Sequence, residues 1–140
     1  MKLILEIYIK ALGIYAFITI PALKSTALYF PSLFCAVVFG SAAWLFFSIV
    51  MGIVQYTNGN SLVKWIMLII SVPVGVAIGH TLIELFGLKA HVWRLNKNLL
   101  FPLAAVIAGW ISLWINKTKI TETFTEMKTL KVVDIKNQKS

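Results

Sequence analysis

Charged residues are scarce in this sequence. They make up 13% of its 140 residues, and 59% of the residues are hydrophobic, whereas a soluble domain carries about 25% charged residues. The mean hydropathy is +0.87. A domain of this size cannot bury so much apolar surface, because a small protein has too much surface for its volume. The composition excludes an ordinary soluble enzyme, a disordered tail and a disulfide scaffold, and it predicts a polytopic membrane protein.

Side chains that could perform catalysis are also few. The single aspartate is Asp134, and the single cysteine, Cys35, lies inside an apolar run, so a C-x-x-C redox or metal-transfer pair is impossible. The sequence contains no H-E-x-x-H, G-x-S-x-G or P-loop motif, which are the patterns that place nucleophiles, bases and phosphate-binding loops. We therefore expect a protein that is not an enzyme and that holds no cofactor or metal ion.

Four apolar segments dominate the chain. A helix needs about 20 apolar residues to cross the hydrocarbon core of a membrane, and a barrel strand would alternate polar and apolar residues instead. The segments therefore predict an all-α fold, a bundle of four transmembrane helices within residues 1–116, followed by a polar, basic cytoplasmic tail over 117–140. The predicted spans cover residues 3–23, 32–54, 63–86 and 99–115. A tight turn over 25–31, closed by a proline, is expected between the first two.

The first segment has two rival interpretations. Lys2, the apolar stretch 11–23 and the small residues at 25–27 outline a cleavable signal peptide, although Lys10 interrupts the apolar region and Pro21 lies late in it. Alternatively, residues 1–10 lie in the membrane interface and only 11–23 enter lipid, a stretch too short to cross.

The distribution of positive charge predicts the orientation. With four spans, nine lysines fall on the side of the N-terminus, the Asn-Gly turn at 55–61 and the tail, and four basic residues fall on the other side. Positive charge marks the cytoplasmic side, so both termini are expected in the cytoplasm, although the basic loop 87–98 opposes this locally. A three-span arrangement with the N-terminus outside would place seven basic residues in the cytoplasm and six outside, which is a weaker bias. The small size and general character of the chain, rather than any motif, favour a bacterial cytoplasmic (inner) membrane.

The net charge of +8 indicates contact with an anionic lipid bilayer rather than with nucleic acid. The basic residues lie between and after apolar runs, and all but Arg94 are lysines. A dedicated phosphate or carboxylate clamp favours the planar fork of arginine. The lysine-rich tail also carries Ile120, Phe124, Met127 and Leu130 at helical spacing, which fits either an amphipathic helix on the membrane surface or a solvated basic tail.

Two pairs of ionisable residues stand four positions apart. Glu6 and Lys10 would share one helix face near the chain start, as a polar patch or as an interfacial ion pair. His80 and Glu84, with Thr81 between them, form the candidate intramembrane polar site, because ionisable groups within a span are functional suspects by default. One histidine and one carboxylate are too few for a zinc site, so a structural contact between helices is the alternative.

Small residues recur on three of the four segments, and on the second segment they are the run 40–43 (Gly-Ser-Ala-Ala). The helix-packing candidates are Gly75, Gly79, Ala104, Ala105, Ala108 and Gly109. Small residues four positions apart let helices approach closely in lipid. Pro73, just before the Gly75 pair, is expected to kink its segment and to free the carbonyl of Ile69.

The sequence leaves two functions open. The first is a small non-enzymatic membrane protein that acts through helix and loop contacts with a membrane-protein partner or with its own copies, such as an accessory subunit, an immunity or exclusion factor, or an anchor. The second is a small oligomeric transporter or channel that uses the break between Pro73 and Gly79 together with His80 and Glu84.

Overall fold

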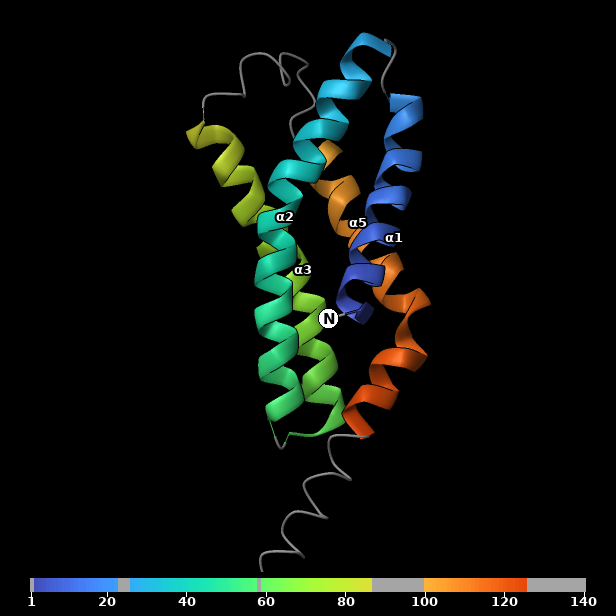
Figure 1. Ribbon diagram of the computed structural model, residues 1–140, viewed down its shortest axis with the longest axis vertical. Coiled ribbons are helices and arrows are strands. Elements are labelled where there is room, and N and C mark those ends of the chain that lie inside the picture. Colours follow the sequence, from blue (N-terminus) through green and yellow to red (C-terminus); the bar gives the residue numbers. More distant parts are fainter. Residues whose placement is uncertain (1, 23–25, 58, 87–99, 126–140) are drawn as a thin grey trace, which may run out of the picture.

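The computed structural model describes residues 2–22, 26–57, 59–86 and 100–125, and all regular structure within them is helical (Figure 1). This part of the chain confirms an all-helical fold. A further helix covers residues 117–125 after a turn at residue 116. The named elements are α1 (Lys2–Thr19), η1 (Ile20–Ala22), α2 (Thr26–Tyr56), α3 (Ser61–Leu85) and α5 (Leu100–Ile115).

The helices associate in two pairs. The most extensive contacts join α2 to α3 and α1 to α5, whereas α1 and α2 touch much less. Figure 1 shows α1 starting part of the way along the α2–α3 hairpin, with residues 117–125 beside the hairpin below that start. We call the end of the bundle that holds the α2–α3 turn and residues 117–125 the lower end.

The α2–α3 turn follows the sequence prediction closely. The α2 helix ends at Tyr56 and α3 begins at Ser61, so the polar Asn-Gly stretch forms the connection. The side chain of Asn60 caps α3, because its oxygen accepts a hydrogen bond from the backbone N–H of Leu62 at 3.4 Å. An N-cap of this kind satisfies one of the donors that the first helical turn leaves without a partner.

The expected turn over 25–31 is wrong for most of its length, because α2 is helical from Thr26 onwards. Pro31 therefore lies inside a helix rather than at the end of a loop. A proline costs a helix the hydrogen bond to the residue four positions earlier. At Pro31 that acceptor is the carbonyl of Ala27 near the start of α2, where the loss affects a single bond of a long helix.

Pro73 lies inside α3, where it cannot donate to the carbonyl of Ile69. A neighbouring helix supplies the missing donor: the indole Nε1 of Trp110, on α5, donates a hydrogen bond to Ile69 O at 3.0 Å. Lipid offers no donor for such a carbonyl, so an unsatisfied one is costly in a membrane. The freed carbonyl that the sequence predicts is therefore used to join α5 to α3.

The largest apolar cluster lies toward the lower end. It draws residues from all four long helices and from 117–125, namely Ile7, Phe47, Met51, Val54, Leu68, Leu113, Ile120 and Phe124. The start of the basic tail is thus a helix whose apolar side chains are buried against the bundle. Met127 and Leu130, the other apolar residues of the expected pattern, lie outside the described residues.

Two helical stretches, Ala36–Tyr56 and Ser61–Leu85, are long and apolar enough to cross a membrane by length and composition. Four such helices are not shown, because α1 carries three charged side chains and Phe101–Ile115 is shorter. Large apolar side chains nevertheless cover much of the outside: Phe17, Phe30 and Trp114 are 78%, 74% and 74% exposed. The two long helices and this surface indicate a membrane protein.

Candidate functional site

A polar cluster joins the start of α1 to the end of α5. The Nζ of Lys10 lies 2.7 Å from Glu6 Oε1, which confirms the pairing that the four-residue spacing predicts. The same Nζ donates to Oδ1 of Asn116 at 2.9 Å. Lys119 donates to both carboxylate oxygens of Glu6, at 2.7 and 2.8 Å. Glu6 therefore links α1 to the helix that follows α5.

Two buried hydrogen bonds in succession, which we call the ladder, lie next to this cluster. The hydroxyl of Ser112 donates to the backbone carbonyl of Ile7 at 2.6 Å, and the amide of Asn116 donates to Ser112 O at 2.8 Å. Ser112 is fully buried and Asn116 is 1% exposed. A buried polar group is stabilising only when it has a partner, and this ladder supplies one for each. It fixes the register of α5 against α1.

The sequence alone did not identify Ser112, Asn116 and Lys119 as members of a site. A weak signal was present, because Ser112 and Asn116 stand four residues apart at the end of an apolar run and therefore share a helix face. Nothing in the local spacing indicates that this face meets Glu6, which is 113 residues away from Lys119.

Phe124 anchors the lower end. Its ring lies edge-on to Trp65, with the ring centroids 6.3 Å apart. The ammonium group of Lys64 lies 5.2 Å from the Phe124 centroid. Lys64 is 8% exposed, and a cation over an aromatic face is favourable, more so when it is shielded from water. Lys64, which has no evident role in the sequence beyond its charge, thus holds the segment 117–125 against α3.

The predicted polar pair on α3 lies closer to the opposite end. His80 Nε2 stands 3.7 Å from Glu84 Oε1, which is within ion-pair range but too long for a direct hydrogen bond. Both side chains are partly exposed. The hydroxyl of Thr81 donates to Ala77 O, in its own helix, at 2.9 Å. Among the described residues, no three His, Cys, Asp or Glu side chains gather as metal ligands would.

The glycines of the GxxxG motif bring α3 against α2. A Cβ at Gly79 would stand 2.9 Å from the carbonyl oxygen of Phe39, and one at Gly75 would stand 3.2 Å from the carbonyl oxygen of Ala43. On α5, a Cβ at Gly109 would stand 2.6 Å from Val72 Cγ1. These three glycines therefore make close contacts inside the molecule.

The alanines of α5 meet α1. Ala104 and Ala108 are buried in a cluster with Tyr15 and Phe101, and Ala105 packs against that cluster. All six helix-packing candidates thus have neighbours within this chain.

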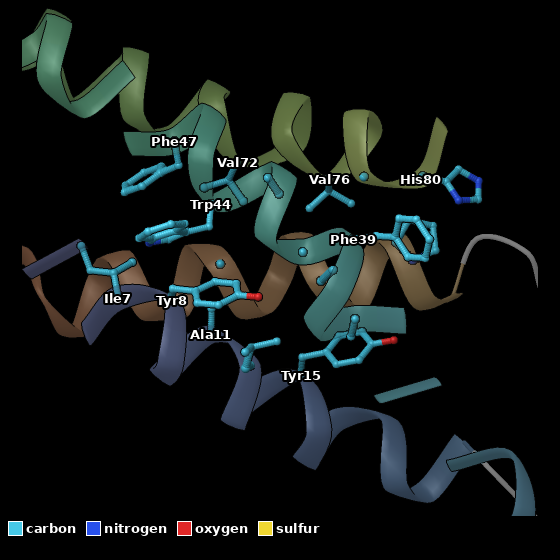
Figure 2. Close-up of a pocket in the computed structure, with 18 of the residues that line it drawn as sticks. Ile7, Tyr8, Ala11, Tyr15, Phe39, Trp44, Phe47, Val72, Val76 and His80 are labelled. Atoms are coloured by element: carbon cyan, nitrogen blue, oxygen red, sulfur yellow. The ribbon is translucent and has the colours of Figure 1, made fainter. Parts of the chain in front are cut away.

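A cavity of about 180 Å³ lies between the α1–α5 pair and the α2–α3 hairpin (Figure 2). All four long helices line it, and almost all of the lining is apolar. Tyr8, on the wall, donates its hydroxyl to the carbonyl of Val37 at 3.0 Å. His80 contributes to the lining at the end away from Trp44 and Phe47.

Comparison with protein-family models, with curated proteins and with solved structures finds no match for this chain. Its function therefore has to be argued from its own residues and geometry.

Proposed function

We propose that the chain crosses a bacterial cytoplasmic membrane four times, with both termini in the cytoplasm, and acts without catalysis by binding a membrane-embedded protein. The two long apolar helices form one hairpin of this arrangement. The α1–α5 pair packs beside the hairpin and supplies the other two spans. In Figure 1 the C-terminal ends of α1 and α3 and the N-terminal ends of α2 and α5 point toward the end opposite the lower end, as four alternating spans require.

Two of the three charged residues of α1, Glu6 and Lys10, fit a span because they have partners, and Lys2 is the first residue of the helix. Glu6 accepts hydrogen bonds from Lys10 and Lys119, and Lys10 also donates to Asn116. An ionisable side chain enters a membrane when it pairs with another group or reaches the interface. The cluster provides the first condition, and the lysine stems allow the second.

The proposed mode of action rests on one observation: the helix faces that carry small residues already pack against other helices of this chain. They are occupied by contacts within the chain, so a partner meets large apolar side chains instead. On α2 these side chains recur every three or four residues along one face of the helix. The one position in this row without a large apolar side chain is Ser41. We call this row the α2 stripe; it consists of Phe30, Phe34, Val37, Leu45, Ile49, Ile53 and Tyr56, all exposed.

Site-specific photo-crosslinking in native membranes tests the proposal. A photoreactive amino acid at Leu45, in the α2 stripe, is expected to give a discrete crosslinked protein whose mass distinguishes a different partner from a second copy. Ile70, exposed on α3, is the matched control position and is expected to give lipid adducts alone. Absence of any protein adduct from both positions would refute binding to a membrane protein, and an adduct from Ile70 alone would refute the assignment to α2.

The alternative function is transport of a small solute by an oligomer. It is supported by one observation: His80, paired with Glu84 on α3, lines a cavity that all four long helices share. Replacing both residues by leucine separates the two functions. A transporter loses flux while the protein still inserts, whereas the proposed interaction protein keeps its crosslink from Leu45.

A further inference from the structure

The first turn of α3 lies at the lower end of the bundle and has open backbone donors. Asn60 caps the helix: its side chain accepts from the N–H of Leu62, and its carbonyl accepts from the N–H of Lys64 at 3.2 Å. The N–H groups of Ser61 and Val63 belong to the same turn, and no acceptor for either is found within the described residues. Open donors and the positive end of the helix dipole attract an anion.

Lys64 adds a buried ammonium group beside this turn. It is the fourth residue of α3, and helical side chains lean toward the N-terminus of their helix, so its stem runs back along the first turn. Lys64 is 8% exposed, and within the described residues the one interaction of its ammonium is with the ring of Phe124. A ring face supplies no oxygen acceptor, so the three N–H donors of the ammonium lack one.

The ammonium of Lys64 is accessible although most of the side chain is covered. Among the described residues, the buried side-chain polar atom that is both closed off and without a hydrogen-bond partner is Nε1 of Trp44 alone. The Nζ of Lys64 therefore keeps some accessible surface, and its acceptor comes from outside the chain. A buried donor without an acceptor calls for such an explanation.

We propose that the phosphate of an anionic phospholipid binds at this turn and accepts hydrogen bonds from Lys64 Nζ and from the N–H of Val63. A lysine binds phosphate as a point charge. Leu62 and Val63 are 62% and 47% exposed in the same turn, so the acyl chains of the lipid have apolar surface to contact, which free phosphate cannot use. The inference rests on the proposed function, which places the lower end at the cytoplasmic surface, where anionic lipids and lysines meet.

NMR of the chain in lipid nanodiscs, with serine and valine labelled with ¹⁵N, tests this inference. Phosphatidylglycerol added to phosphatidylcholine nanodiscs is expected to move the amide resonances of Ser61 and Val63 downfield. The resonance of Val74, farther along α3, is expected to stay in place. Inorganic phosphate at the same phosphate concentration, added to phosphatidylcholine nanodiscs, is expected to move none of them. An unmoved Val63 resonance with phosphatidylglycerol overturns the inference, and an equal shift with inorganic phosphate overturns the lipid as the source.

Two matched variants separate a site from the general attraction of lysines to an anionic surface. Lys64→Gln is expected to raise the phosphatidylglycerol fraction at half of the Val63 shift about thirtyfold, the loss of one charge-assisted hydrogen bond. Lys117→Gln removes the same charge from the helix that follows α5 and is expected to raise it less than about fivefold, the effect of one lysine near an anionic surface. Equal effects of the two variants overturn the inference.

The folding of each variant is checked separately. The indole N–H resonance of Trp110, whose donor is bonded to Ile69 O, reports on it. If Lys64→Gln does not fold, the two titrations of the unaltered protein still decide the question. No partner protein is present in these nanodiscs, so their result is independent of the crosslink from Leu45.

Discussion

Replacing Trp110 by phenylalanine removes one hydrogen-bond donor and keeps an aromatic ring. The donor lies 3.0 Å from Ile69 O, and this carbonyl has no donor in its own helix at position 73 because that residue is proline. Trp110 is 44% exposed, so the bond lies near the surface that we assign to lipid, where nothing replaces it.

The expected cost follows from two measured ranges. A hydrogen bond between membrane helices contributes on average about 0.6 and at most about 1.7 kcal/mol, and leaving a buried carbonyl unsatisfied costs about 1–3 kcal/mol. We therefore expect Trp110→Phe to lower the free energy of unfolding by about 1–2 kcal/mol. Trp114→Phe, at an exposed position on the same helix, is the control and should change it by less than about 0.5 kcal/mol.

A double-mutant cycle isolates the bond. Pro73→Ala restores a backbone N–H that reaches Ile69 O within α3, so Trp110→Phe should cost much less in that background. The expected coupling free energy is about 1 kcal/mol, within the range for residues in contact. Unfolding by SDS in mixed micelles, or steric trapping in bilayers, measures all four proteins. A coupling within about 0.3 kcal/mol of zero, the scatter of independent sites, would refute the argument.

Three further predictions follow from the packing and the orientation. Gly79→Ala forces the α2 and α3 backbones apart and should cost about 1–3 kcal/mol of unfolding free energy. Gly52→Ala, where an added Cβ meets nothing within 4 Å, should be stabilising by roughly 0.5–1 kcal/mol, because glycine weakens a helix interior relative to alanine. Equal effects of the two substitutions would contradict the packing. Phe124→Ala should cost about 3 kcal/mol locally and speed tryptic cleavage between 117 and 125, and an unchanged cleavage rate would show that the segment is not anchored there. In a Cys35→Ser background, a cysteine at Gly59 should react with an impermeant thiol reagent from the cytoplasmic side alone; reaction from outside intact cells would reverse the proposed orientation.

The extents of the helices could be predicted from the apolar runs and from the residues that interrupt them. The predicted span 63–86 corresponds to α3 (Ser61–Leu85), and the predicted span 99–115 corresponds to α5 (Leu100–Ile115). The first span was predicted to end at residue 23, and the structure gives an α-helix to Thr19 with a short 3-10 turn through Ala22. Pro21 explains the change, because it lacks the N–H that would continue the α-helical bonding.

The contacts between helices were predictable only where a local rule applied. Four-residue spacing identified the Glu6–Lys10 pair, because both residues belong to one helix. The same reasoning cannot reach Lys119, whose bond to Glu6 depends on how α5 pairs with α1. Likewise, a GxxxG motif predicts close approach of another helix but does not identify that helix. Here the partner of Gly79 is α2 of the same chain.

The bond between Glu6 and Lys119 has a consequence for the order of events during synthesis. Since translation runs from the N-terminus, Glu6 is synthesised 113 residues before Lys119, and until then Lys10 is its ion-pair partner. The helix over residues 117–125 can therefore bond to α1 only after the ribosome has passed residue 119. A shortened chain that stops just before that point would keep the bond from Ser112 to Ile7 and lose only the tie between α1 and the helix that follows α5.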